Sequence, residues 1–133
     1  MLVAAIVALI GLADSGYLTV KHVRGDYVRC DDDCSAVLGS KYAEIAGVPL
    51  AGVGAVAYFI VFLAATLAAI GYTGARRVVT LFAIPMAVTS LGLIYLQGFV
   101  IHSFCKYCLL SATACITLAV LVLTEWLLCH RAR

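Results

Sequence analysis

The chain has 133 residues, of which 65% are hydrophobic and 12% are charged, with a mean hydropathy of +1.10 and a net charge of +2. Soluble globular domains carry about 25% charged residues. This composition therefore excludes a soluble domain and indicates an integral membrane protein, for which we expect the lipid bilayer and no nucleic acid as a partner.

Four apolar stretches are long enough to cross a bilayer, which takes about 20 apolar residues. We expect membrane spans at about residues 2–20, 48–72, 78–101 and 105–128. The first span contains one charge, Asp14, and lacks the basic start of a secretory signal, so we interpret it as retained. The pattern predicts an all-α membrane protein in which one four-helix bundle forms a single domain over residues 1–133.

Glycine and proline mark the ends of these spans. Gly47-Val48-Pro49 opens the second span, because proline suits the first turn of a helix, where its missing N–H would be unpaired anyway. The segment from Gly71 to Arg77 closes this span in a short turn. Pro85 falls inside the third span and predicts a kink, since it removes one backbone hydrogen bond.

Four spans bring residues 21–47 and the turn 102–106 to one face of the membrane. The opposite face carries four arginines: Arg76, Arg77, Arg131 and Arg133. The Lys/Arg balance slightly opposes placing the first face outside, but that face holds paired cysteines, which favour an oxidising compartment. We therefore expect this face on the extracytoplasmic side of the cell's inner (plasma) membrane.

Four of the six cysteines form two close pairs, Cys30 with Cys34 in the polar segment and Cys105 with Cys108 at the head of the fourth span. In the second pair the two sulfurs lie one helical turn apart and can close a disulfide. The first turn of a helix favours the thiolate, which is the species that exchanges disulfides. At the membrane surface such a thiol can meet a lipid-soluble oxidant, most simply a quinone.

The segment from Cys34 to Ile45 is too short to span a membrane and has apolar residues at near-helical spacing. This pattern predicts a short half-helix that lies at the interface with its apolar face toward the bundle. We expect Cys30 to stay in water, where a soluble partner can reach it.

Three motifs together resemble the vitamin K epoxide reductase family in its bacterial branch. They are Cys34-Ser-Ala-Val-Leu-Gly-Ser40-Lys-Tyr-Ala, Gly47-Val-Pro-Leu-Ala51 and Cys105-Lys-Tyr-Cys108. The resemblance implies a thiol:quinone oxidoreductase that supports disulfide bond formation, with a four-helix bundle around ubiquinone or menaquinone. It also implies a separate thioredoxin-like protein as the electron donor, and we expect the chain itself to be a monomer.

The same resemblance assigns roles to individual residues. Cys30 accepts electrons from the partner, Cys34 passes them to Cys105, and Cys108 delivers them to the quinone. Ser40 matches the family's serine near the reactive cysteines, as a hydrogen-bond donor.

Two positions depart from the vertebrate enzymes of the family. Their quinone-contacting Asn and Tyr fall here at about Leu50 and at Ala112, so we do not expect epoxide reduction as the physiological reaction. Leu50 and Ala112, together with Cys108, are candidate quinone contacts. His102 is a further candidate, as a proton source at the mouth of the helix, although an interfacial polar role fits it better.

Other interpretations of the cysteines and of Asp14 stay open. The two pairs could be static disulfides or a zinc site, although we expect no metal. Cys115 and Cys129 fit core packing. An acid within a membrane span is usually functional, so Asp14 also allows a small proton-coupled transporter, which would leave the paired cysteines unexplained.

Overall fold

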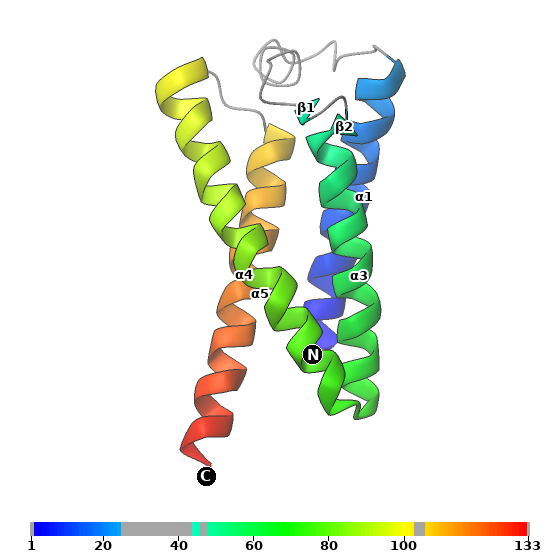
Figure 1. Ribbon diagram of the computed structural model, residues 1–133, viewed down its shortest axis with the longest axis vertical. Helices are drawn as coiled ribbons and strands as arrows, with labels where there is room; N and C mark the ends of the chain where they lie inside the picture. The colour runs from blue at the N-terminus through cyan, green and yellow to red at the C-terminus, as the bar shows by residue number, and fades with distance from the viewer. Residues whose placement is uncertain (1, 25–43, 46–47, 103–105, 133) are drawn as a thin grey trace.

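The computed structural model describes residues 2–24, 44–45, 48–102 and 106–132, nearly all of which are helical (Figure 1). The helices are α1 (Leu2–Arg24), α3 (Leu50–Ile70), α4 (Thr73–Tyr95), the π-helical η2 (Leu96–Ile101) and α5 (Lys106–Arg131). Four spans are long and apolar enough to cross a bilayer. The predicted all-α, four-span architecture is confirmed, and the chain is a multi-pass membrane protein.

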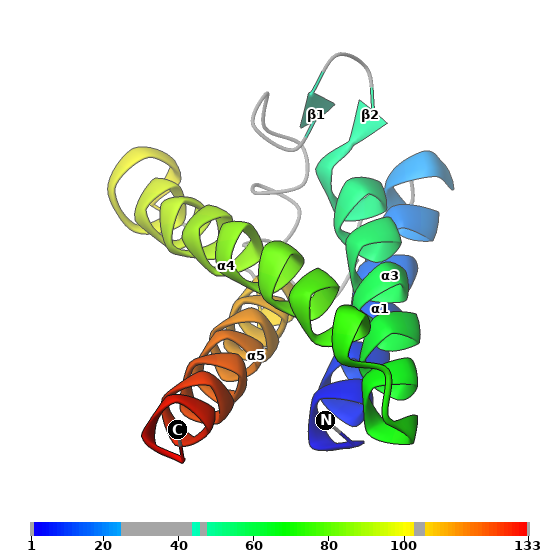
Figure 2. The ribbon, with the colours of Figure 1, turned by 60° about the horizontal axis from the view of Figure 1, so that its bottom comes forward.

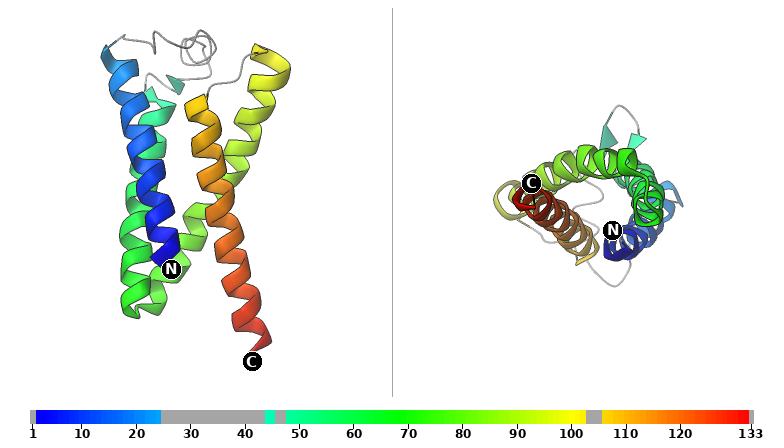
Figure 3. Two further views of the ribbon diagram at one scale, coloured as in Figure 1. Left: turned by 180° about the vertical axis from the view of Figure 1, so that it is seen from behind. Right: turned by 90° about the horizontal axis from the view of Figure 1, so that it is seen from below.

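The helices follow one another round the bundle in chain order, and α5 returns to pack against α1 (Figures 2 and 3). The end of α1, the end of η2 and the beginnings of α3 and α5 lie at the same end of the bundle (Figure 1). We call this the cysteine end, because Cys108 lies in the first turn of α5. The α3–α4 turn and the end of α5 form the opposite end, which we call the arginine end after Arg76, Arg77 and Arg131.

Several helix boundaries differ from the expected spans, by up to five residues. At the arginine end α4 begins at Thr73 rather than at 78, and α5 continues to Arg131 rather than ending at 128. Arg76 and Arg77 consequently lie in the first turns of α4 instead of in a turn between helices. At the cysteine end α1 continues to Arg24 rather than to 20, whereas η2 ends at 101 as expected.

The turn between α3 and α4 is short because of Gly71. This residue has a φ of 126°, in the left-handed region that favours glycine. The N–H groups of Gly71 and Tyr72 donate to the carbonyls of Ala68 and Leu67 at 3.2 Å and so close α3. Two residues therefore suffice to reverse the chain, and α4 starts directly after them.

A small antiparallel pair precedes α3. Its strands are β1 (Glu44–Ile45) and β2 (Val48–Pro49), with Glu44 opposite Pro49. Two predictions are wrong here, because Pro49 ends a strand instead of opening the helix, and Glu44–Ile45 belong to a strand instead of the half-helix. The pairing satisfies backbone groups before the helix begins, and proline is tolerated in so short a strand. The rest of the half-helix, residues 34–43, lies outside the described residues.

The helix α4 continues through Pro85 to Tyr95, and the kink expected there stays a prediction. After Tyr95 the helix widens into η2. It ends at His102, which has a φ of 60° and donates its N–H to the Gln97 carbonyl. Single π-helical turns are frequently found at functional sites, and this one lies at the cysteine end.

Small side chains dominate the interior of the described bundle. The buried alanines are Ala4, Ala5, Ala8, Ala64, Ala65, Ala68, Ala83, Ala112 and Ala114. Such residues let membrane helices approach closely, which is how helices associate in lipid. Large apolar side chains such as Leu81, which is 70% exposed, lie on the outer surface, where they face lipid. Against this background the buried polar side chains stand out.

Candidate functional site

Cys108 lies two residues after α5 begins at Lys106. Its side chain is half-buried and its thiol is free. The first turn of a helix has backbone N–H groups without helical partners, so the location matches the one expected from the sequence. The other predicted sulfur and serine positions lie outside the described residues and stay predictions: Cys30, Cys34, Ser40 and Cys105.

Deeper in the bundle than Cys108 lies a group of polar side chains, which we call the inner polar cluster: Asp14, Tyr58, Ser111 and Cys115. Tyr58 joins α3 to α5. Its side chain is 1% exposed, and its hydroxyl donates to the Ser111 carbonyl at 2.7 Å. The same oxygen lies 3.0 Å from Ser111 Oγ and 2.9 Å from Cys115 Sγ. Because the tyrosine has a single proton to donate, the serine and cysteine can act as donors to its oxygen.

Asp14 is the acidic member of the inner polar cluster. It is 7% exposed, and its Oδ2 atom is buried without a hydrogen-bond partner among the described residues. The carboxylate lies within electrostatic range of Cys108 and Tyr58. Asp14 therefore lies in the interior of the bundle, where its charge acts on the thiol at the head of α5.

Glycine in α1 makes room for Tyr58. A Cβ atom on Gly11 would lie 2.3 Å from Cε1 of the Tyr58 ring. One turn further along α1, Ser15 lies opposite Gly54 of α3, where a Cβ would be 3.6 Å from the serine Oγ. Because neither glycine has a side chain, α1 and α3 approach closely, and this keeps the Tyr58 ring directed toward α5.

Two members of the inner polar cluster lie well inside the bundle. Tyr58 follows the start of α3 by eight residues, and Cys115 follows the start of α5 by nine. At 1.5 Å per residue these offsets correspond to about 12–14 Å along the helices. The cluster thus lies inside the membrane-spanning region, below the surface at which Cys108 lies.

Three further predicted positions are described by the structure. Leu50 is the first residue of α3 and is half-buried, so it belongs to the cysteine end. Ala112 is 5% exposed and lies one helical turn deeper than Cys108 on α5. His102 is exposed at the end of η2, as suits an interfacial polar residue.

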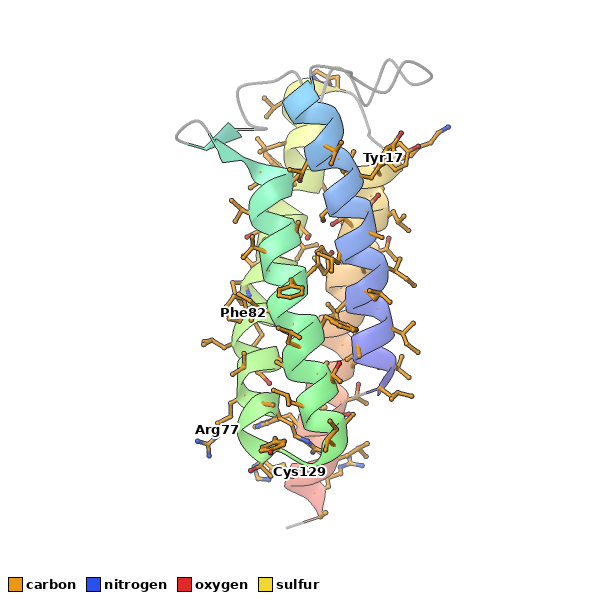
Figure 4. All side chains as sticks on the ribbon, turned by 90° about the vertical axis from the view of Figure 1, so that its right-hand side faces the viewer. Tyr17, Arg77, Phe82 and Cys129 are labelled. Atoms are coloured by element: carbon orange, nitrogen blue, oxygen red, sulfur yellow. The ribbon has the colours of Figure 1, made fainter. Side chains whose placement is uncertain are left out.

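The two remaining cysteines have different surroundings. Cys115 is 4% exposed, which confirms core packing and adds the contact with Tyr58. Core packing is wrong for Cys129, which is exposed near the end of α5 (Figure 4). Its position, two residues before Arg131, explains the difference, because α5 extends there beyond the predicted end of the span.

The aromatic side chains, like the two cysteines, include both buried and exposed members. Tyr58 is buried in the core, whereas Tyr17 lies at the surface of α1 and its ring is 5.4 Å from that of Tyr107 on α5 (Figure 4). Tyr95 and Phe99 form an exposed pair 4.9 Å apart. These contacts fit packing and interface anchoring, which is how such aromatics are more often used.

Sequence reasoning missed Ser111 as a member of the site. The signal was present in the spacing, because Cys108, Ser111 and Cys115 follow one another at i, i+3 and i+7 and so share one face of a helix. Ala112 lies on the same face. The face that carries the thiol therefore also carries the hydroxyl and the second sulfur that hold Tyr58.

The residues near Cys108 fit a quinone, the cofactor that the resemblance implies. A quinone has an apolar ring and two carbonyl oxygens that accept hydrogen bonds. Leu50 and Ala112 provide apolar surface at this end of the bundle, and Asp14 provides a buried carboxyl group whose Oδ2 has no partner among the described residues. The two apolar side chains could contact the quinone ring, and the carboxyl group could supply a proton to a quinone oxygen.

Comparison with protein-family models gives a match. The family model described as the vitamin K epoxide reductase family matches residues 2–123, from the start of α1 to within the last turns of α5. A search among curated proteins finds no match to this chain. Because the family model covers three spans and most of the fourth, the chain belongs to the vitamin K epoxide reductase family, whose members are membrane thiol–quinone oxidoreductases that work with thioredoxin-like partners.

Proposed function

We propose that the chain is a thiol:quinone oxidoreductase of the bacterial branch, with one domain over residues 1–133, that supports disulfide bond formation. Its electrons come from a separate thioredoxin-like protein, and its acceptor is ubiquinone or menaquinone. The observation that carries this proposal is the half-buried free thiol of Cys108 at the head of α5, within electrostatic range of the buried Asp14. A thiol at this depth is within reach of a molecule dissolved in lipid.

The cysteine pairs work by thiol–disulfide exchange. A dithiol on the partner attacks the Cys30–Cys34 disulfide and leaves as a disulfide, so that this pair becomes reduced. The Cys34 thiolate attacks Cys105 of the second disulfide and releases the Cys108 thiolate. Cys30 then attacks Cys34, which restores the first disulfide and leaves the second pair reduced.

The last step returns the second pair to a disulfide. When Cys105 and Cys108 close again, two electrons and two protons leave the pair, and the quinone is the chemical group that takes up both. Asp14 and Tyr58 are the cluster members that can hold and move a proton near Cys108, and His102 is a weaker candidate at the surface. Ser40 donates a hydrogen bond close to the reactive cysteines.

The compartment follows from the chemistry. Disulfide exchange of this kind is useful in an oxidising space, so the cysteine end faces the extracytoplasmic side of the inner membrane and the arginine end faces the cytoplasm. The thioredoxin-like partner approaches from outside and meets Cys30 first. The chain acts as a monomer, because all proposed sulfur transfers occur within one copy.

Quinone reduction by the purified chain tests the proposal. With a reduced thioredoxin-like donor and a soluble quinone analogue, the wild type is expected to consume the quinone, as followed by its absorbance. Cys105→Ser and Cys108→Ser are expected to lose this activity. Cys129→Ser, at the far end of α5, is the matched control and keeps it. Equal turnover in Cys108→Ser and the control would remove the mechanism.

The donor can be identified by trapping. In a Cys34→Ser chain the Cys30 thiol can attack the disulfide of the oxidised partner, and the chain has no second thiol beside it to resolve the bond. A mixed disulfide should therefore accumulate that reducing agent releases. A chain with Cys30→Ser as well is the control and should trap nothing at this position. A partner captured equally by both chains would contradict the role of Cys30 as the entry point.

The buried Asp14 also supports a second candidate, a small proton-coupled transporter. An acid within a membrane span is expensive and is usually functional. This candidate predicts that Asp14→Asn abolishes proton-coupled export from vesicles, while Cys108→Ser leaves export unchanged. It gives the two cysteine pairs no role, which is why the oxidoreductase is the first proposal.

A further inference from the structure

A groove of about 700 Å³ runs between α4 and α5 at the arginine end. One face of α4 lines it with Arg76, Arg77, Leu81 and Ile84, and one face of α5 lines it with Glu125 and Trp126 among others. The groove shares no residue with the inner polar cluster, whose Tyr58 and Cys115 lie nearer the opposite end of their helices. None of the steps proposed for the cysteines uses it.

The polar end of the groove carries positive charge. Arg76 and Arg77 are both exposed, and they lie in the first turns of α4, near the positive end of the helix dipole. In Figure 4, Arg77 extends out from the ribbon at the end of the bundle where Cys129 lies. Two guanidinium groups against the one carboxylate of Glu125 leave a net positive charge. Guanidinium groups pair with phosphate oxygens through two parallel hydrogen bonds, which makes arginine suited to a phosphate ligand.

The rest of the groove is apolar and leads from the arginines toward the membrane centre. Leu81 is 70% exposed and Ile84 is 56% exposed on α4, while the buried Val122 of α5 lies between the two helices. Trp126 is 58% exposed on the facing side, and tryptophan is enriched at the level of lipid headgroups. The lining thus passes from cations through an aromatic ring to aliphatic side chains, in the order in which a phospholipid presents its phosphate, glycerol and acyl chain.

We propose that this groove binds an anionic phospholipid, whose phosphate contacts Arg76 and Arg77 and whose acyl chain lies along Leu81 and Ile84. Charge and shape both favour this occupant. A free phosphate would leave the aliphatic lining unused, and a quinone has no anionic group for the arginines. Basic pockets between membrane helices are a recurrent form of site for such headgroups. The site does not depend on the redox reaction or on which face of the membrane the arginine end occupies.

Lipid retention by the full-length chain tests the proposal. The protein is placed in mixed micelles that contain phosphatidylglycerol or phosphatidylcholine, and the bound lipid is counted by native mass spectrometry. The wild type is expected to retain phosphatidylglycerol in preference to phosphatidylcholine. Arg76→Gln with Arg77→Gln should weaken this retention by about tenfold or more, since a charge-assisted hydrogen bond contributes on the scale of a tenfold change in affinity.

Arg131→Gln is the matched control, because Arg131 is an exposed arginine at the same end that does not line the groove. It should retain phosphatidylglycerol like the wild type. Equal loss in the control and the double variant would overturn the proposal, because it would show a general effect of charge. Equal retention in all three chains would overturn it as well.

A second measurement needs no substitution. Cys129 is exposed and lines the groove, so its maleimide labelling, resolved by peptide mass spectrometry, reports occupancy in the wild type. Phosphatidylglycerol should slow labelling more than phosphatidylcholine does. Slowing by inorganic phosphate alone, or by a quinone analogue to the same degree, would assign the groove to that molecule and overturn the lipid proposal.

Discussion

Replacement of Gly11 by alanine tests how the inner polar cluster is held together. The new Cβ would lie 2.3, 2.5 and 2.7 Å from three atoms of the Tyr58 ring. Carbon atoms in contact are normally about 3.5–4.0 Å apart, so the ring would have to move by about 1 Å. Tyr58 is 1% exposed and touches both α1 and α5, which leaves it little space in which to do so.

The magnitude follows from two effects. Overpacking of a filled core costs about 1–3 kcal/mol. A displacement of about 1 Å would also stretch the 2.7 Å bond from the Tyr58 hydroxyl to the Ser111 carbonyl beyond the range of an O–H···O bond, and a hydrogen bond contributes about 1 kcal/mol. Alanine in place of a helical glycine also gains about 0.5–1 kcal/mol. We therefore expect Gly11→Ala to lower the free energy of unfolding by about 1–3.5 kcal/mol.

The assay is an unfolding titration of the purified chain from mild detergent into dodecyl sulfate, followed by helical circular dichroism. Gly16→Ala is the matched control, since it lies in the same helix and its added Cβ would meet nothing within 4 Å. The free energy of unfolding of this variant should rise by about 0.5–1 kcal/mol, because alanine loses less conformational entropy than glycine when a helix forms. If Gly11→Ala proved as stable as Gly16→Ala, the close packing of α1 on Tyr58 would be refuted.

Three further substitutions probe the site. Tyr58→Phe removes the hydroxyl that bonds α5, so in the same titration its free energy of unfolding should fall by about 1–2 kcal/mol. An equal fall in Tyr72→Phe, at an exposed position, would contradict a stabilising role of the buried hydroxyl. Asp14→Asn keeps the size of the side chain but removes its acid, so quinone reduction should slow at least tenfold while partner trapping on Cys30 continues; unchanged quinone reduction would remove Asp14 from the proton path. His102→Gly should raise stability by about 1 kcal/mol, because glycine adopts a positive φ without strain; a loss of stability in the titration would mean that the imidazole makes a contact that outweighs the strain.

The fold could be predicted because bilayer thickness acts on every residue of a span in the same way. A stretch of about 20 apolar residues has few alternatives to a membrane helix, and the four stretches gave the four helices. The errors in the predicted fold lie at helix boundaries, where a local contact decides at which residue the helix begins. Gly71 shortens one turn, so α4 begins at Thr73, and the pairing of β1 with β2 takes Pro49 out of the helix. Neither effect is visible in hydropathy.

The sequence predicts the position of a site residue within its own helix, but not its contacts with other helices. Cys108 could be singled out because its position in the first turn of the fourth span depends on the local sequence alone. The link from Tyr58 to Ser111 and Cys115 joins residues more than 50 positions apart. It depends on the missing side chain of Gly11 on a third helix. Such a combination follows from three helices packing together, and no local pattern encodes it.

The location of Asp14 bears on the choice between the two candidate functions. In the sequence it is an isolated acid, and an isolated acid in a membrane span suits a proton-coupled carrier as well as an enzyme. In the bundle it lies within electrostatic range of the Cys108 thiol and of the Tyr58 hydroxyl. A carrier needs its acid to be reached from both sides of the membrane in turn, whereas a redox site needs a proton store near the thiol that gives up electrons. The surroundings of Asp14 fit the second requirement better, and they favour the proposed oxidoreductase over the transporter.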